Sequence, residues 1–562
     1  MPTTPHSCQR HAISRSRRRP AVVVLAVLAL LLAACGGSDT PSGAGGASGS
    51  GDGGQARGLV IARDMDINSM DPQRAYCDTC QIYLSAAYQT LIGLDVDDPD
   101  KQLPRLATSW EANADNTEFT FALDPAAVFS DGSPVEAKDV KWSWERLANL
   151  KGSASYLMAG VKEIATPDAK TVKVTFSAPN SAFLPIVSAS YMGIVNSDVA
   201  GAEGMAVSGP GADTKDQAEQ WFAKNSAGSG PFTLATYTQN DQLALARNEK
   251  FWQDKSAFPT VTMKQVKDSI TQVQQLQQGD VDVAMQVSFD AVSQLKGDPK
   301  LTVTPVDSYN YVYIALSPGA KGKGAAELAD PRVRQAIRSA IDYQGVLDTT
   351  VAGNGRTQAS PIPNGFLGSD GLPLPEQDVA KAQQLLSAAG KSGGFTLDAT
   401  YPKANVYGVD FDVMMQKVKQ DLAKVKIDVQ LTPVDFTAWA DLIAKQGIPM
   451  TAVYFAPDFT DSSQYVQYFG LIPDSSWAAR AGGGAAGTPL SNPAETALYA
   501  KALNASGEAK KSVYNELGTL MMNDAIILPM VNPKLVLAYA SDITGMHLSA
   551  CCNLELGQLG LR

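Results

Sequence analysis

Histidine is nearly absent from this chain, with three residues in 562. His6 and His11 lie in an N-terminal segment that we expect to be removed, so His547 remains alone. Histidine is the commonest general base and metal ligand in proteins. A multi-histidine metal site is therefore excluded, and a Ser-His-Asp triad would depend on His547. We expect neither an enzyme nor a bound metal or cofactor, and we interpret His547 as a surface or structural residue.

Cysteine is scarce as well, with six residues. Cys8 belongs to the segment expected to be removed, and Cys35 has a separate role described below. An even number of remaining cysteines in an exported protein predicts structural disulfides, and three pairings are possible. The C-x-x-C spacing also suits redox or zinc chemistry, but the segment has no thioredoxin-like βαβ setting. The four candidates for pairing are Cys77, Cys80, Cys551 and Cys552.

Positive charge is outnumbered, since 46 lysines and arginines face 57 acidic residues. Residues 1–34 hold five arginines and no acidic residue, so their removal moves the formal charge from −11 to −16. A surface of this sign repels phosphate groups. Nucleic acid is therefore excluded as an expected partner.

The N-terminus carries a short apolar run, Ala21 to Ala34, behind a group of arginines. Its 14 residues are fewer than the roughly 20 that span a bilayer, but they suit a signal peptide. The run ends in Leu32-Ala33-Ala34-Cys35, which resembles the lipobox of bacterial lipoproteins and makes Cys35 the predicted lipidation site. An ordinary export signal with a chance cysteine is the alternative. Arginines 17–19 leave the general secretory and twin-arginine routes both open.

The rest of the chain predicts a signal peptide (1–34), a lipid-anchored flexible linker (35–58) and an ordered mixed α/β protein from residue 59. Alternating segments indicate strands, and Asp330-Pro331 is typical of a capped helix start. The expected strands are 59–61, 117–123, 171–176, 311–315, 395–397 and 427–431; the expected helices begin at Asp330, Asp378 and Asp410. The glycines 482–484 predict a loop.

The stretch FSDGSPVEAKDVKWSWERL, residues 129–147, predicts a turn followed by a helix. Ser133, Pro134 and Glu136 fit a capping box with serine as N-cap. Ala137, Val140, Trp144 and Leu147 then share one helix face, which predicts that they pack in a core. Trp142 lies about 200° from Val140 around the helix, at roughly 100° per residue, so we expect it off this face.

Together with several other segments in order, this stretch resembles family 5 of bacterial extracellular solute-binding proteins. These are the oligopeptide, dipeptide and nickel-chelate binding components of ABC importers. The resemblance covers residues 59–562. Its segments are Ser69-Met70-Asp71-Pro72, Leu106 to Glu111, residues 129–147, Gly228 to Phe232, Arg247-Asn248 with Phe251-Trp252, Gly279 to Asp282, Asp330 to Asp342, and Lys381 to Gly390.

The resemblance implies an α/β fold of the two-lobed periplasmic-binding-protein type (type II, cluster C), in which the chain crosses twice between lobes. Lobe I would hold residues 59–312 and 530–562, with an inserted subdomain at about 101–225, and lobe II residues 313–529. The crossings are expected near 310–317 and 527–531. Only a ligand that touches both lobes favours the closed form. Peptide ligands of the family bind extended, through main-chain hydrogen bonds.

The same resemblance implies a site. In peptide-binding members an aspartate of lobe II receives the ligand's α-ammonium, and Asp458 takes its position here, with Asp461 as the competing carboxylate. Dipeptide-type members also use an arginine for the ligand's carboxylate, but Asn405 stands there, with Lys403 the nearest cation. This departure favours longer peptides. The remaining implied contacts are Tyr454, Phe455, Pro457 and Phe459 around Asp458, and Tyr76, Asp78 and Thr79 in a lobe I loop.

The implied function is a monomeric, lipid-anchored receptor on the outer face of the cytoplasmic membrane. It would deliver peptides to an ABC permease and its ATPase subunits. A nonpeptide ligand such as an oligosaccharide or metal chelate is an alternative, and so is a surface sensor that acts without transport.

Overall fold

The computed structural model describes residues 57–562 except 96–97, 99–100, 468–491 and 551–552. The described residues belong to one compact unit. The predicted signal peptide, Cys35, nearly all of the linker, the glycines 482–484, Cys551 and Cys552 lie outside the described residues. Within them, no helix combines the length and apolar character needed to cross a membrane.

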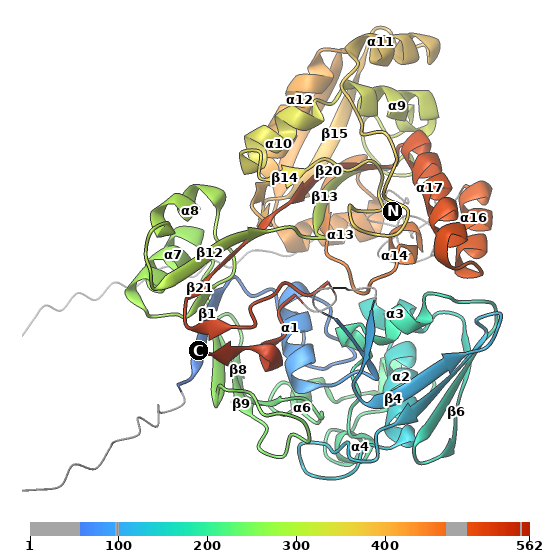
Figure 1. Cartoon of the computed structure of the whole chain (residues 1–562). Coiled ribbons are helices and arrows are strands. Elements are labelled where there is room, and N and C mark those ends of the chain that lie inside the picture. Colours follow the sequence, from blue (N-terminus) through green and yellow to red (C-terminus); the bar gives the residue numbers. More distant parts are fainter. Residues whose placement is uncertain (1–56, 96–97, 99–100, 468–491, 551–552) are drawn as a thin grey trace, which may run out of the picture. The chain divides into compact units, whose positions relative to one another are not determined.

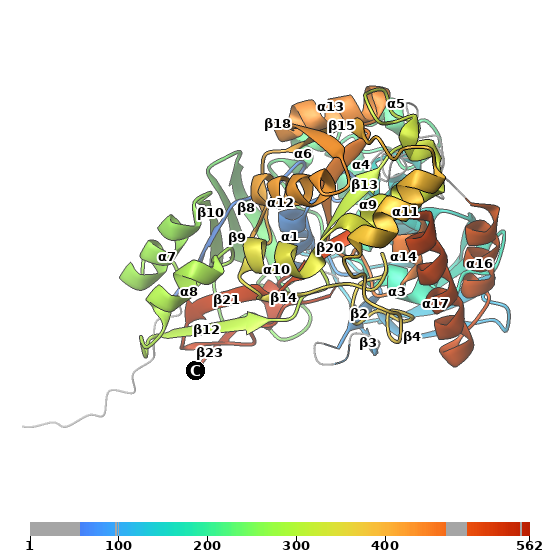
Figure 2. The ribbon, with the colours of Figure 1, turned by 90° about the horizontal axis from the view of Figure 1, so that it is seen from above.

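One sheet of seven strands combines segments from both ends of the described chain. The first strand, β1, lies parallel to β10 and β11, while β21, from the C-terminal region, pairs antiparallel with β11 and β12. Helices α7 (Ser269–Gln278) and α8 (Phe289–Leu295) lie side by side next to this sheet (Figures 1 and 2). In sheet order the strands are β12 (Leu301–Val306), β21 (Leu535–Ala540), β11 (Val283–Ala284), β1 (Leu59–Arg63), β10 (Thr260–Gln265), β9 (Gln242–Arg247) and β8 (Phe232–Thr238).

A second sheet of six strands is built from the middle of the chain. Its order is β14 (Gly355–Arg356), β20 (Ile527–Pro533), β13 (Tyr311–Leu316), β19 (Met450–Phe455), β15 (Phe395–Pro402) and β18 (Ile427–Val434). The helices of this part are α9 (Pro331–Ala340), α10 (Tyr343–Val351), α11 (Val379–Ala388), α12 (Phe411–Ala423), α13 (Phe436–Gln446), α14 (Ser463–Val466), α16 (Pro493–Leu503) and α17 (Gly507–Asp524).

Two short connections join the sheets. Strand β12 of the first sheet leads into β13 of the second through residues 307–310, and β20 returns to β21 through Lys534 (Figure 1). Each connection falls within a few residues of a predicted crossing. The two sheets with their helices form the two lobes, so the predicted two-lobed architecture is confirmed.

A third sheet lies within lobe I, in the order β4 (Ala107–Ala112), β5 (Glu118–Leu123), β7 (Thr171–Phe176) and β6 (Val161–Asp168). Its buried side chains alternate along β5 and β7, as the sequence predicts. Nearby elements are α1 (Asp78–Ala87), α2 (Ala137–Asn149), α3 (Phe183–Val187), α4 (Ser197–Ala202), α5 (Ala212–Lys215), α6 (Glu219–Phe222) and the 3₁₀ turns η1 (Ser153–Met158) and η2 (Ser190–Met192).

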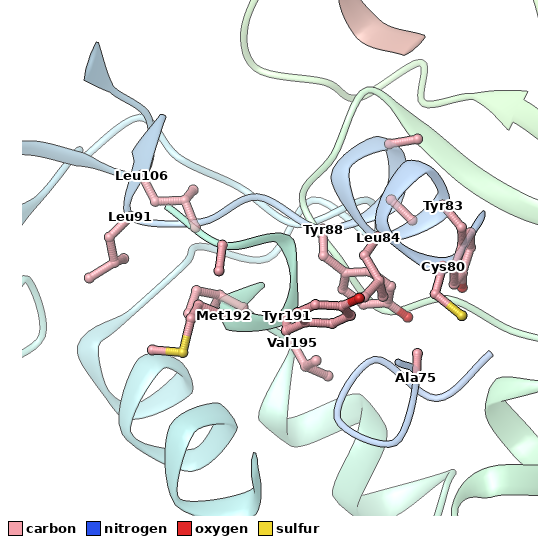
Figure 3. Packing of buried hydrophobic residues seen from close by; sticks show 14 of the residues in the cluster. Ala75, Cys80, Tyr83, Leu84, Tyr88, Leu91, Leu106, Tyr191, Met192 and Val195 are labelled. Carbon is pink, nitrogen blue, oxygen red and sulfur yellow. The ribbon is translucent and has the colours of Figure 1, made fainter. Parts of the chain in front are cut away.

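Lobe I has one large apolar core, to which α1 and η2 both contribute. Figure 3 shows Cys80, Tyr83 and Leu84 of α1 gathered with Tyr191 and Met192 of η2. This packing fixes the start of α1, which carries residues of the candidate site described below.

The predicted cap of the helix in residues 129–147 is wrong. Helix α2 begins at Ala137, and its capping box is formed by Glu136 and Asp139 rather than by Ser133. The reason lies just before it: Pro134 pairs with Val128 in an isolated β-bridge, which keeps the backbone extended at that point. The helix therefore starts three residues later than the sequence pattern indicates.

The predicted helix face is confirmed, since Trp144 is buried and its indole N–H donates to the carbonyl of Met192 at 3.2 Å. Trp142 is half-buried, and its ring lies 5.8 Å from the guanidinium carbon of Arg146. Arg146 is completely buried and bonds the carboxylates of Asp71 and Asp216. Trp142 thus covers one side of a buried ion cluster.

Three helices of lobe II begin where the sequence predicts. Asp330, Asp378 and Asp410 each accept a hydrogen bond from a backbone N–H in the first turn of α9, α11 and α12. Pro331 stands at the first position of α9, where its missing N–H costs nothing.

Candidate functional site

Asp458 receives two tyrosine hydroxyls at a single oxygen. The hydroxyls of Tyr76 and Tyr156 each donate to Oδ2 of Asp458, both at 2.6 Å. Tyr76 precedes α1 and Tyr156 lies in η1, so both donors come from lobe I, whereas Asp458 follows β19 of lobe II. Its own backbone N–H donates to Oε1 of Gln464 at 2.9 Å. The predicted ammonium site therefore lies where the two lobes meet.

The carboxyl of Asp458 is buried, with 3% of its surface exposed. Among the described residues, no lysine or arginine forms an ion pair with it. Burial raises the pKa of Asp458 to about 8, the negative charge of Asp78 adds to this, and the hydrogen bond from Tyr76 opposes it. A buried carboxyl of this kind is stabilised by a cation that enters with a ligand.

A second carboxyl, Asp78, stands at the N-terminal end of α1 and contacts lobe II. The hydroxyl of Tyr407 donates to its Oδ2 at 2.8 Å. Burial and the nearby charge of Asp66 raise the pKa of Asp78 to about 6, against the opposing effects of Arg63 and the Tyr407 hydroxyl. Two predicted site residues of lobe I, Tyr76 and Asp78, thus both contact the opposite lobe.

Between them, Cys77 forms a disulfide with Cys80. Cys77 is also the N-cap of α1, where its sulfur accepts the backbone N–H of Cys80 at 2.9 Å. Of the three pairings that the sequence allows, the structure therefore contains the local one. This cross-link restricts the backbone of the turn that holds Tyr76 and Asp78.

Thr79 points into lobe I rather than toward Asp458. Its hydroxyl accepts from Nε of Arg63 at 2.8 Å and donates to Asp66 at 2.6 Å. The residue is fully buried. Its contacts hold the first turn of α1 in place beneath Asp78.

The four aromatic and proline residues around Asp458 lie in different settings. Phe455 is buried and packs edge-on against Tyr465, with ring centroids 5.3 Å apart, and half-buried Tyr454 meets the ring of Tyr407 at 5.7 Å. The carbonyl of Pro457 accepts from Nε2 of Gln81 in lobe I at 3.3 Å. Phe459 is fully buried within the core cluster of lobe I.

Asp461, the competing carboxylate, already has a cationic partner. Nζ of Lys510 lies 2.6 Å from its Oδ2, and the hydroxyl of Tyr514 donates to Oδ1 at 2.8 Å. Burial acts to raise the pKa of Asp461, but the charge and hydrogen bond of Lys510 bring it below the ordinary value. Asp461 is therefore satisfied within lobe II, unlike Asp458.

The predicted contacts Lys403 and Asn405 are exposed. Asn405 belongs to β16 (Asn405–Val406), which pairs with β17 (Val409–Asp410) in a tight hairpin. Tyr407, at the turn of this hairpin, is the residue that reaches Asp78. The hairpin thus contributes a hydroxyl rather than a cation to the contact between the lobes.

Sequence reasoning missed Tyr156, Tyr407 and Gln81. Tyr156 lies in a short 3₁₀ turn without periodic pattern, and Tyr407 lies two residues beyond the position taken from the family resemblance. The proximity of Tyr407 to Asn405 was the only available signal for it.

A body of two lobes joined by two short strand connections, with a buried carboxyl between them, defines a bilobal solute-binding protein. The family model of bacterial extracellular solute-binding proteins, family 5 (middle region), matches residues 101–476. The chain belongs to this family, as its sequence motifs predict, and the family is one of extracellular binding proteins rather than enzymes.

Relatives by sequence agree with this assignment. A probable D,D-dipeptide-binding periplasmic protein, DdpA of Escherichia coli K12, is 29% identical over 419 residues, which is 73% of this chain and 77% of that protein. The glutathione-binding protein GsiB of Pectobacterium atrosepticum is 27% identical over 508 residues, with 88% and 92% covered.

The fold is also that of solved binding proteins. The periplasmic binding protein DppA of Helicobacter pylori, in complex with the peptide STSA, superposes with a TM-score of 0.75 at 21% identity. The match covers 90% of this chain and 98% of DppA. It confirms the predicted two-lobed fold.

Proposed function

We propose that the protein is the substrate-binding lipoprotein of an ABC importer and captures peptides, oligopeptides in particular, between its lobes. The observation that carries this proposal is the buried carboxyl of Asp458, which has no cationic partner among the described residues. The α-ammonium of a peptide supplies the missing cation through a charge-assisted hydrogen bond. Relatives named for dipeptide and glutathione binding support a peptide-like ligand.

In this proposal Asp458 binds the ammonium, and residues of both lobes surround the first part of the peptide. Tyr76 and Asp78 act from lobe I, and Thr79 supports Asp78. Tyr454, Phe455 and Pro457 shape the wall next to Asp458, and Phe459 holds this segment against the core of lobe I. No arginine stands at Asn405, and Lys403 is exposed, so the peptide's carboxylate is not held at one fixed place. This arrangement favours ligands of variable length.

Capture follows from a shift between open and closed forms. The proposed lobe I comprises residues 59–312 and 530–562, with the subdomain at about 101–225, and lobe II comprises 313–529. A peptide that contacts both lobes stabilises the closed form by its differential affinity for that form. The closed protein would then dock on a permease with its ATPase subunits and release the peptide.

The N-terminal signals complete the proposal. Residues 1–34 act as a signal peptide, Cys35 carries the lipid, and residues 35–58 tether a monomeric receptor to the outer face of the membrane. Replacement of Cys35 by alanine should move the protein from the membrane fraction to the soluble exported fraction. Continued membrane retention of that variant would remove the lipid anchor from the proposal.

Mass spectrometry of ligands released from the purified protein tests the ligand class directly. Peptides support the proposal, whereas an oligosaccharide or metal chelate supports the nonpeptide alternative. Calorimetry with trialanine and N-acetyl-trialanine then tests the ammonium contact, since acetylation removes the charge. We expect binding of the first only, and loss of binding in Asp458→Asn. The surface variant Asp441→Asn serves as the control.

A genetic experiment separates the importer from the sensor. Deletion of the partner permease should abolish uptake of a bound peptide while binding persists. A response to peptide that continues without any uptake would favour the sensor.

A further inference from the structure

The two tyrosine hydroxyls that contact Asp458 both bond the same oxygen of its carboxyl group. Tyr76 and Tyr156 both donate to Oδ2, each at 2.6 Å. For the other oxygen, Oδ1, no donor is found among the described residues. One oxygen is thus held by lobe I, and the other is left for a ligand.

We propose that Tyr76 and Tyr156 are positioning residues that clamp a proton-bearing Asp458 in the unliganded closed protein, so that capture of a cationic ligand releases this proton. The inference rests on the proposed function for the nature of the ligand. It adds a change of protonation that accompanies binding.

The surroundings of Asp458 favour its neutral form. Among the described residues, the titratable side chains that interact with it come from the turn before α1 and from α1, η1, η2 and α14, and none of them carries positive charge. They are Tyr76, Asp78, Tyr156, Tyr191 and Tyr465. A buried carboxyl without a cation becomes neutral by keeping its proton. Burial accordingly raises the pKa of Asp458 to about 8.

The tyrosines are themselves held in place. The ring of Tyr76 stacks on Tyr191, with centroids 5.0 Å apart, and its backbone N–H donates to Asn68 at 2.9 Å. Tyr156 lies in η1, which packs directly against α2. These contacts restrain both tyrosines, so both hydroxyls approach Asp458 from fixed positions in lobe I.

Ligand capture changes the protonation of Asp458. An ammonium that approaches Oδ1 forms an ion pair with the carboxylate, so the O–H bond of the Asp458 carboxyl breaks and its proton passes to solvent. The ligand's own amine titrates near 7.7–8.0 in free peptides. At pH 6 about one proton should therefore be released per peptide bound, near pH 8 the net number should approach zero, and at pH 10 about one proton should be taken up.

The ligand-free protein provides the first test. The difference in proton titration between the wild type and Asp458→Asn should show one proton with a midpoint near pH 8. Tyr76→Phe and Tyr156→Phe each remove a donor that favours the carboxylate, so each should move this midpoint to higher pH. Tyr343→Phe is the matched control, because it removes a buried hydroxyl from the separate core of lobe II and should leave the midpoint unchanged.

Calorimetry of trialanine binding in buffers of different ionisation enthalpy provides the second test. About one proton released at pH 6 in the wild type, with the reversal at high pH, supports the inference. Binding at pH 6 without proton release overturns it, as does a ligand-free midpoint near pH 4 or one that neither tyrosine variant moves. If peptides fail to bind at every pH, the proposed peptide function is wrong. The titration of the ligand-free protein then decides by itself whether Tyr76 and Tyr156 hold a protonated Asp458.

Discussion

The hydroxyl of Tyr407 donates a 2.8 Å hydrogen bond to Asp78, a residue 329 positions earlier in the chain and in the opposite lobe. Together with the two bonds to Asp458, it joins the lobes on both sides of the disulfide-bonded turn. The lobes are therefore held together by hydroxyl-to-carboxyl contacts, and these contacts make specific predictions.

Replacement of Tyr407 by phenylalanine should weaken peptide binding about 3- to 10-fold. The bound protein is closed, and the variant loses one closed-state hydrogen bond, typically about 1 kcal/mol. Calorimetry with trialanine measures the effect. Tyr401→Phe is the matched control, because its hydroxyl donates to Asp412 at the same distance of 2.8 Å but within lobe II. Equal losses in both variants would contradict a role in closure.

Rising pH should open the unliganded protein. Asp458 has a pKa of about 8 in the closed form, whereas a hydrated aspartate in the open form has about 3.9. The closed form is therefore favoured most strongly below about pH 4, and this preference is lost as the pH rises through 8, with about 6 kcal/mol as its upper bound. Asp78, with a pKa of about 6, acts in the same direction.

Small-angle scattering measures this opening as an increase in radius of gyration between pH 5 and 9. Asp458→Asn carries no titrating group at this position, so most of the increase should disappear. An increase of the same size in that variant would show that Asp458 does not control closure.

The buried ion cluster in lobe I should be required for stability. Arg146 bonds Asp71 and Asp216 with all three side chains fully buried. Arg146→Leu leaves the two buried carboxylates with the partly exposed Arg74 as their remaining cation, and removal of one member of a buried ion pair typically costs about 3–5 kcal/mol. Urea unfolding measures the change. The exposed pair of Arg332 and Asp330 offers the control, since Arg332→Leu should change stability little. Similar unfolding midpoints for both variants would contradict this role.

Loss of the Cys77–Cys80 disulfide should affect binding as well as stability. The double variant Cys77→Ser, Cys80→Ser removes a short cross-link worth about 2 kcal/mol in the chain-entropy model. It also frees the turn that holds Tyr76 and Asp78, so peptide affinity should fall even at temperatures where the protein remains folded. Calorimetry below the unfolding transition separates the two effects, and unchanged affinity there would show that the turn is held without the disulfide.

Much of the fold could be predicted from local signals. Asp330, Asp378 and Asp410 cap their helices because the side chain and first-turn N–H groups are neighbours in sequence. The alternation of β5 and β7 likewise reflects a single buried face. The cap of α2 could not be predicted, because the bridge between Val128 and Pro134 competes with it.

Only part of the candidate site could be predicted from the sequence. Asp458 follows from its position in a family motif, and the structure gives it the burial that the proposal requires. Tyr156 meets Asp458 across 302 positions of sequence, and no local pattern reports such a contact. Family resemblance can locate a carboxyl, but the hydroxyls that adjust its chemistry depend on how two lobes close.

Phe459 adds a kinetic consequence. It follows Asp458 directly, yet its ring belongs to the core of lobe I. When the lobes separate, this ring has to leave the core of lobe I and become exposed to water. Full exposure of a phenylalanine side chain costs roughly 1.5–3 kcal/mol. If closure in the absence of ligand depends on this contact, a ligand enters only when the lobes separate. Its association rate should then follow the frequency of these openings, so Phe459→Ala should speed capture while it shortens the lifetime of the complex.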